Sequence, residues 1–339
     1  MRELKGKCKT FIELYSFFVI LYHFIYASGL LSWLGITIGG IHPAISVGLI
    51  LSILYLLFPY SKKTQQTGIP WYDWILAILC LIPTGYYALN YEMLLYSALT
   101  PTDFEVVLGV VMIILCIEGV RRAIGLPLVI CGLIFVIYPL VANSLPGILF
   151  AAPVKFRRLI GYIYLGSQGF FSAGAQVFST TIITFVIFGQ LIAISGGGVF
   201  FLNLSLSAMG GRNGGPAKAA TIGSGLFGMI SGVAVANVVT TGSITIPMMK
   251  RKGYSPEFAG AVETVASTGG ALMPPVMGAL AFIMADYMGV PYWQIASAAI
   301  IPAVLYYVAV YLQVSFYSSR HRLGGLSTEE IPAIKKVLA

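Results

Sequence analysis

Charged residues are scarce in this sequence of 339 amino acids: Lys, Arg, Asp and Glu make up only 9% of it, whereas 58% is hydrophobic. A soluble domain needs a larger charged fraction, so this composition excludes the soluble class and indicates a polytopic membrane protein. The formal net charge of +8 could suggest nucleic-acid binding. However, the basic residues cluster in short segments between apolar runs, as membrane orientation requires, and no nucleic-acid-binding module is recognisable.

Residues that bind metals or catalyse hydrolysis are equally few. The four cysteines show neither CxxC nor Cys/His spacing, so we interpret them as small apolar residues. The three histidines, His23, His42 and His321, are isolated in the sequence, and no HxxxxD, DDxxD or GxSG spacing occurs. These absences argue against a membrane-embedded enzyme and against a transition-metal site. The charge rings or repeated carbonyl filter of a channel are not evident either.

The most informative stretch that is present runs from Lys218 to Lys252. It is apolar, but it carries Gly, Ser, Thr and Asn where an ordinary membrane helix has Leu, and both of its ends are basic. Clusters of Lys and Arg stay on the cytoplasmic side, so the stretch should cross the membrane an even number of times. One span needs about 20 residues, and two do not fit. We therefore expect a re-entrant hairpin with its tip at residues 231–237; a single Gly-rich helix in close contact with its neighbours is the alternative.

A hairpin tip at membrane depth has chemical consequences. Broken helices are tolerated there only where they line protein or water. Their free N–H and carbonyl groups are what transporters use to bind an anion and its coupling cations. A second interruption is expected after Pro256, where Ser267-Thr268-Gly269-Gly270 is followed by Pro274-Pro275. Adjacent prolines remove two backbone donors, so this segment is either a simple kink or an ion-lining break.

The remaining apolar runs predict the other spans of an all-α membrane protein with about eight transmembrane helices. With a cytoplasmic N-terminus and an uncleaved first span, Lys62-Lys63 and Arg121-Arg122 fall inside the cell. The spacing of apolar residues from Phe156 to Tyr164 predicts an amphipathic helix in the membrane interface. A loop is expected between Gly196 and Lys218. The predicted runs are residues 11–31, 42–58, 69–90, 104–119, 126–142, 177–194 and 291–316.

Residues 224–286 read SGLFGMISGVAVANVVTTGSITIPMMKRKGYSPEFAGAVETVASTGGALMPPVMGALAFIMAD. This segment strongly resembles the large, DctM-like membrane subunit of tripartite ATP-independent periplasmic (TRAP) transporters. The whole chain resembles, more weakly, fused permeases served by TAXI-type binding proteins. In that resemblance residues 1–122 are similar to the small four-helix subunit, 123–175 to the connecting helix and linker, 176–322 to the N-terminal half of the large subunit, and 323–339 to a cytoplasmic loop.

The resemblance implies an elevator-type importer of a small organic acid in the prokaryotic inner membrane. Sodium would be the coupling ion, no other cofactor would be needed, and a periplasmic TAXI-type binding protein would deliver the substrate. By position, the residues expected at the sodium sites are Ser231, Gly232 and Asn237 at the tip and Ser267, Thr268 and Gly269 in the broken helix, and those expected near the substrate are Thr240, Thr241, Pro274 and Pro275.

Two departures from the family pattern bear on these expectations. The family commonly has Ser-Gly-Ser at the hairpin tip, whereas this chain has Ser231-Gly232-Val233, which removes one hydroxyl. The family's large subunit also contains two inverted halves with one hairpin each, and only one such motif occurs here. We therefore expect the N-terminal portion of a split or truncated permease, whose partner is a C-terminal half. The alternative is a scaffold subunit that does not itself transport.

Overall fold

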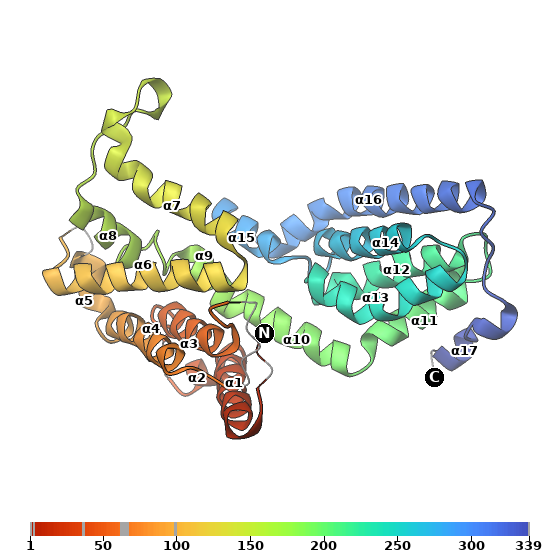
Figure 1. Ribbon diagram of the computed structural model, residues 1–339, viewed down its shortest axis with the longest axis horizontal. Helices are drawn as coiled ribbons and strands as arrows, with labels where there is room; N and C mark the ends of the chain where they lie inside the picture. Colours follow the sequence, from red (N-terminus) through yellow and green to blue (C-terminus); the bar gives the residue numbers. More distant parts are fainter. Residues whose placement is uncertain (1, 3, 36–37, 62–67, 98–99, 338–339) are drawn as a thin grey trace. The chain divides into compact units, whose positions relative to one another are not determined.

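The computed structural model describes residues 2, 4–35, 38–61, 68–97 and 100–337 (Figure 1). All regular secondary structure in these ranges is helical, which confirms the predicted all-α class. The chain forms two compact units, residues 1–180 and residues 181–339. Each unit has its own cluster of buried apolar side chains.

Several helices have the length and composition of membrane spans, in agreement with the predicted polytopic class. Five of those in the described residues reach the roughly 18–20 apolar residues that a bilayer requires, and three shorter helices are also apolar. The five are Gly6–Ala27, Trp71–Leu89, Leu126–Ser144, Ala173–Ile194 and Tyr292–Arg320, and the three are His42–Leu57, Gly197–Met209 and Ala279–Met288.

The N-terminal unit contains a helix at each predicted run up to residue 142, and it contains the predicted amphipathic helix. That helix buries Leu159, Ile160 and Tyr164 and exposes its basic first turn. The Tyr164 hydroxyl donates to the carbonyl of Pro83 at 2.6 Å and so joins two helices within the unit. The helices are α1 (Gly6–Ala27), α2 (Leu30–Trp33), α3 (His42–Leu57), α4 (Trp71–Leu89), α5 (Tyr91–Ser97), α6 (Asp103–Ala123), α7 (Leu126–Val141), α8 (Phe156–Tyr164) and α9 (Ala173–Val177), with short 3₁₀ turns at Ala142–Ser144 and Gly147–Leu149.

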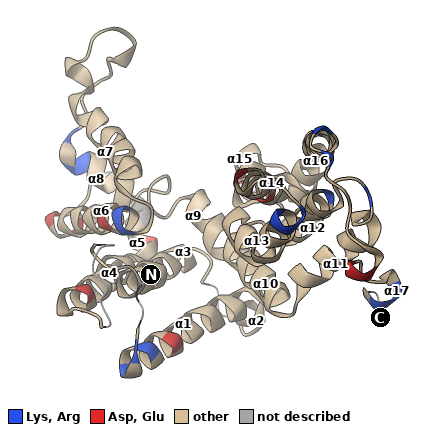
Figure 2. Cartoon of the chain, turned by 45° about the vertical axis from the view of Figure 1, so that its right-hand side comes forward, with Lys and Arg blue, Asp and Glu red and all other residues tan. Residues whose placement is uncertain are grey.

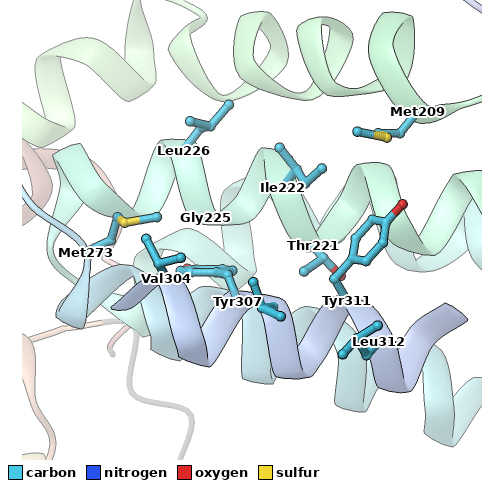
Figure 3. Close-up of a pocket in the computed structure, with 11 residues that line it drawn as sticks. Met209, Thr221, Ile222, Gly225, Leu226, Met273, Val304, Tyr307, Tyr311 and Leu312 are labelled. Atoms are coloured by element: carbon cyan, nitrogen blue, oxygen red, sulfur yellow. The ribbon is translucent and has the colours of Figure 1, made fainter. Parts of the chain in front are cut away.

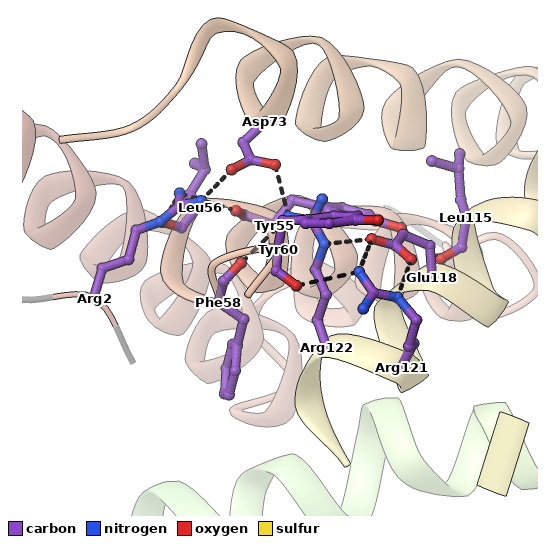
Figure 4. A network of polar contacts seen from close by, with 10 residues as sticks. All are labelled: Arg2, Tyr55, Leu56, Phe58, Tyr60, Asp73, Leu115, Glu118, Arg121 and Arg122. Atoms are coloured by element: carbon purple, nitrogen blue, oxygen red, sulfur yellow. Dashed lines mark hydrogen bonds and ion pairs between the residues drawn. The ribbon is translucent and has the colours of Figure 1, made fainter. Parts of the chain in front are cut away.

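A buried network of charges ties the start of the chain to α4 and α6 (Figure 4). Asp73 is fully buried and accepts from both Arg2 and Arg122, the latter at 2.6 Å. Arg122 also binds Glu118 at 2.7 Å, and Arg121 binds the same carboxylate at 2.6 Å. Arg121-Arg122, which the sequence predicts only as orientation signals, close a structural network here. Lys62-Lys63, the other predicted signal, lies outside the described residues.

The C-terminal unit contains one helix that the sequence does not predict. The loop expected between Gly196 and Lys218 is wrong, because α11 occupies most of it. Gly223 of α12 lets that helix approach α11, since a Cβ there would lie 3.2 Å from the Cα of Leu202. The elements are α10 (Ile183–Ile194), α11 (Gly197–Met209), α12 (Gly215–Ser231), α13 (Ala234–Arg251), α14 (Pro256–Gly269), η4 (Gly270–Leu272), α15 (Ala279–Met288), α16 (Tyr292–Arg320), η5 (Thr328–Glu330) and α17 (Ile334–Val337), and a π-helical segment, Phe178–Ile182, precedes α10.

Charged side chains are confined to few places in this unit, and Figure 2 shows basic residues near the ends of α13 and α16. Lys250 and Arg251 form the last turn of α13, and Arg320 ends α16. Cations there complement the negative C-terminal end of the helix dipole. The orientation of the chain in the membrane is predicted by counting crossings, and α11 adds an apolar helix to that count before the hairpin. The orientation therefore stays a prediction.

Candidate functional site

The stretch from Lys218 to Lys252 folds as two helices, so the single-helix alternative is wrong. Helices α12 and α13 are joined by only two residues, Gly232 and Val233. Gly232 has φ 62, and its N–H closes α12 by donating to the carbonyl of Gly228 at 2.9 Å. Glycine adopts this left-handed conformation without steric cost, which explains why it ends the helix here. Each arm is shorter than the roughly 20 residues of a full span, as a re-entrant hairpin requires.

The hairpin tip contains a buried hydroxyl that has no hydrogen-bond partner among the described residues. Ser231 is only 8% exposed, and its Oγ makes no hydrogen bond to any group that the structure describes. Ser231 and Gly232 line a cavity of about 50 Å³ together with Val276 and Met277. A buried polar atom of this kind normally has a protein, water or ion partner, and the cavity is large enough for one water or ion. The tip is therefore equipped to bind something small and polar.

The second predicted interruption lies against this tip. Helix α14 ends at Gly269 and passes through η4 into a non-helical segment that includes the cis Pro274–Pro275 peptide and Met277 at φ 62. The N–H of Val276 donates to the carbonyl of Met229 at 3.2 Å. The two segments approach closely, since a Cβ on Gly228 would lie 2.7 Å from the Cα of Gly270.

A carboxylate that is not among the predicted site residues organises the interior of the hairpin. Glu263 of α14 is fully buried, and it forms no ion pair with any residue that the structure describes. Its Oε1 accepts from Ser224 and Thr241 at 2.5 Å each, and its Oε2 accepts from Thr245 at 2.5 Å. Ser267 adds a bond of 3.2 Å to Oε1. Two features of the sequence could have indicated this cluster: an acidic residue within an apolar run, and the hydroxyl residues Thr241 and Thr245 spaced four apart, on one face of α13.

Asn237 is held beside this carboxylate. Its Nδ2 donates to the carbonyl of Ser224 at 2.8 Å, and its Oδ1 lies 3.1 Å from Oγ1 of Thr241. Asn237 is fully buried, and the exposed fraction of Thr241 and of Ser267 is only 1%. One polar cluster around Glu263 therefore contains the side chains of Asn237, Thr241 and Ser267. The sequence predicts Asn237 and Ser267 at the sodium sites and Thr241 near the substrate.

The remaining predicted site residues lie outside the polar cluster around Glu263. Thr240 donates to the carbonyl of Ala236 at 2.9 Å and packs near Gly198 of α11. Thr268 is exposed and donates to the carbonyl of Thr264 at 2.7 Å, so its hydroxyl is already used. The last three are in the broken segment: Gly269 is buried, Pro274 is partly buried and Pro275 is exposed.

A larger cavity, of about 400 Å³, lies between α11, α12 and α16 and is almost entirely apolar (Figure 3). Thr221 and Tyr307 are among the residues that line it. Their hydroxyls are already bound to the carbonyls of Ala217 and Ala266, at 2.9 and 2.7 Å. Polar ligands need convergent polar groups, so this cavity does not suit an organic acid.

Comparisons with known proteins point in one direction. The family model "Tripartite ATP-independent periplasmic transporter, DctM component" matches residues 110–339, which is more than half of the chain. The C4-dicarboxylate TRAP transporter large permease protein DctM of Vibrio cholerae is 34% identical over 110 residues, which are 32% of this chain and 24% of that protein. The isethionate TRAP transporter permease protein DctMQ of Oleidesulfovibrio alaskensis is 32% identical over 162 residues, 47% of this chain and 22% of that protein.

A third relative, the uncharacterized protein y4mL of Sinorhizobium fredii, is 29% identical over 162 residues, which are 44% of this chain and 38% of that protein. The chain therefore spans less than two fifths of the length of each of these relatives.

Proposed function

Because the chain belongs to the DctM component family of the tripartite ATP-independent periplasmic transporters, we propose that it is a permease component of a sodium-coupled importer of a small organic acid. The family consists of transport permeases, so the expectation that the chain is not an enzyme is confirmed. Two relatives are named for C4-dicarboxylate and isethionate transport, which supports an organic anion as the substrate class.

The unpartnered hydroxyl of Ser231 carries the proposal of a cation site at the hairpin tip. Hard monovalent cations take oxygen ligands, and interrupted helices supply them as free carbonyls and hydroxyls. The close contact between Gly228 and Gly270 supports a site that takes oxygens from both the tip and the end of α14. We assign Ser231, Gly232 and Asn237 to this site, with Ser267 and the backbone of Thr268 and Gly269 on the α14 side.

The substrate would bind near the same tip. The first turn of α13 presents backbone N–H groups that have no partner within the helix, and a helix N-terminus favours an anion. Thr240 and Thr241 follow this turn, and Pro274 and Pro275 lie in the facing break. A carboxylate or sulfonate group placed there would have the coupling cation close by.

The proposed partners follow from the transporter class. A periplasmic binding protein, of the TAXI type, would deliver the substrate to a permease in the inner membrane with its N-terminus in the cytoplasm. The remainder of the permease, on this polypeptide or on a second chain, would complete the site. The hairpin and the broken helix would move together against the rest of the protein, as an elevator does.

Sodium-dependent stability tests the cation site directly. The purified chain in detergent would be unfolded by heat at increasing NaCl, with choline chloride holding the ionic strength constant. A ligand that binds only the folded state raises the unfolding temperature in proportion to the logarithm of its concentration above Kd. We expect this rise with sodium, and we expect Ser231→Ala to remove it. An equal response to potassium and choline would refute the cation site and favour the scaffold alternative.

A further inference from the structure

Glu263 is a buried carboxylate that the proposed transport function does not yet use. It receives hydroxyl groups from three helices: Ser224 of α12, Thr241 and Thr245 of α13, and Ser267 of its own helix, α14. Burying a carboxyl group is costly unless it is well hydrogen-bonded, so four donors at one carboxyl indicate a specific arrangement.

Asn237 links the cluster to the tip, and its orientation is fixed. A backbone carbonyl cannot donate, so the amide nitrogen of Asn237 must face the carbonyl of Ser224, 2.8 Å away. Its carbonyl oxygen, Oδ1, is then turned toward Thr241, whose Oγ1 is 3.1 Å away. Among the described contacts of Asn237, only the hydroxyl of Thr241 can donate a side-chain hydrogen bond to Oδ1.

Glu263 decides where that proton goes. Oγ1 of Thr241 lies 2.5 Å from Oε1 of Glu263, nearer than either oxygen of Asn237, at 2.9 and 3.1 Å. A carboxylate is also the stronger acceptor, so Thr241 donates to Glu263. Ser224 lies 2.8 Å from Thr241 and 2.5 Å from Glu263, and its proton stays within this group. Oδ1 of Asn237 therefore keeps its lone pairs free.

We propose that Glu263 is a positioning residue: by accepting the proton of Thr241, it leaves the carbonyl oxygen of Asn237 free to bind the coupling cation. This inference rests on the proposed function, because it takes Asn237 as a cation ligand. Glu263 itself acts through Thr241 and does not touch the cation. Three of its four hydroxyl donors, Ser224, Thr241 and Thr245, also hold both hairpin arms to α14, which keeps the tip and the broken helix at a constant separation.

The substitution Glu263→Gln tests the idea at nearly constant size. The new side chain is neutral and has a single acceptor oxygen, which is a weaker acceptor than a carboxylate oxygen. The hydroxyl of Thr241 would therefore be held less firmly and would donate to Oδ1 of Asn237, where it competes with the cation. We expect the sodium concentration at half-maximal thermal stabilisation to rise about tenfold or more, as for loss of one strong hydrogen bond. Glu257→Gln is the matched control, because Glu257 is exposed in the first turn of the same helix and should leave the midpoint unchanged.

A rescue experiment separates this role from a merely structural one. In the double variant Glu263→Gln with Thr241→Val, no hydroxyl proton is left to occupy Asn237, so the sodium midpoint should return toward that of the wild type. A structural role predicts that the double variant is worse than either single one. Measured in the Thr241→Val background, Glu263→Gln should shift the sodium midpoint by less than about threefold; a shift as large as that in the wild-type background would overturn the proposal.

A spectroscopic readout keeps the test independent of sodium coupling. With ¹⁵N-asparagine labelling of the full chain, the side-chain amide signals of Asn237 are identified by their loss in Asn237→Asp. They should shift in sodium-free Glu263→Gln, return in the double variant and remain in place in Glu257→Gln. A wild-type protein without a sodium response would refute the coupling ion, whereas unchanged Asn237 signals in Glu263→Gln would refute the role of Glu263.

Discussion

The close approach of Gly228 to Gly270 makes a quantitative prediction about the contact between the hairpin and the broken helix. In Gly228→Ala, the new Cβ would lie 2.7 Å from the Cα of Gly270 and 2.8 Å from Nδ2 of Asn237. Backbone at Gly270 cannot yield without moving η4, and Nδ2 is held by a hydrogen bond. Overpacking of this kind costs about 1–3 kcal/mol of unfolding free energy. We expect Gly228→Ala to lower stability by this amount and to weaken the sodium response, because Asn237 is displaced.

A control on α14 gives the opposite sign. Gly260 lies within that helix, and a Cβ there would meet no atom within 4 Å. Gly260→Ala should therefore stabilise the protein by about 0.5–1 kcal/mol, through the lower conformational entropy of alanine in the unfolded chain. Both variants would be unfolded by denaturant in the same detergent, and the midpoints compared. If Gly228→Ala behaved like Gly260→Ala, the packing of the tip against the break would be refuted.

Three further predictions address other parts of the molecule. Asp73→Ala leaves two buried guanidinium groups without their shared carboxylate, so we expect a loss of about 3–5 kcal/mol in denaturant unfolding, whereas Glu13→Gln, in an exposed pair, should change stability by less than about 1 kcal/mol. The Lys252 ammonium, aided by Ser327, lowers the pKa of Glu330 to about 2, so this contact is fully formed above the ordinary carboxyl pKa of about 4.3 and is lost as the pH falls through 2. In Lys252→Met the carboxyl signal of Glu330, followed by ¹³C NMR, should titrate closer to its ordinary pKa; an unchanged midpoint would contradict the assignment. Tyr307→Phe removes the donor to the carbonyl of Ala266 and should cost about 0.5–1.5 kcal/mol, with the same denaturant midpoint as the measurement.

The hairpin could be predicted because its signals are local. Basic residues at both ends and small residues in between constrain how Lys218 to Lys252 can sit in a bilayer, whatever surrounds it. Gly232 could be placed near the turn because only glycine readily takes a left-handed backbone there. The break after Gly269 was visible for the same reason, since adjacent prolines cannot continue a helix.

Features that depend on tertiary contacts could not be predicted in this way. Helix α11 has 13 residues, too few for a recognisable span, and the glycines at its start resembled a turn. Gly196 does adopt a left-handed conformation, but the chain returns to a helix immediately after it. The buried partners of Asp73 are Arg2 and Arg122, which lie 71 and 49 residues away in the sequence, so no local pattern reveals them.

Glu263 shows the limit most clearly. It stands in an early turn of α14, but its role depends on hydroxyls 18 to 39 residues earlier in the chain, which no local pattern connects to it. A Gly–Gly contact at the tip and the hydrogen bonds of three hairpin hydroxyls to Glu263 join the same two segments at two separate places. Two such attachments prevent the segments from pivoting about either one. A cation that bridges the tip and the break would therefore bind to a preformed pair of surfaces, and its binding energy would not be spent on ordering them.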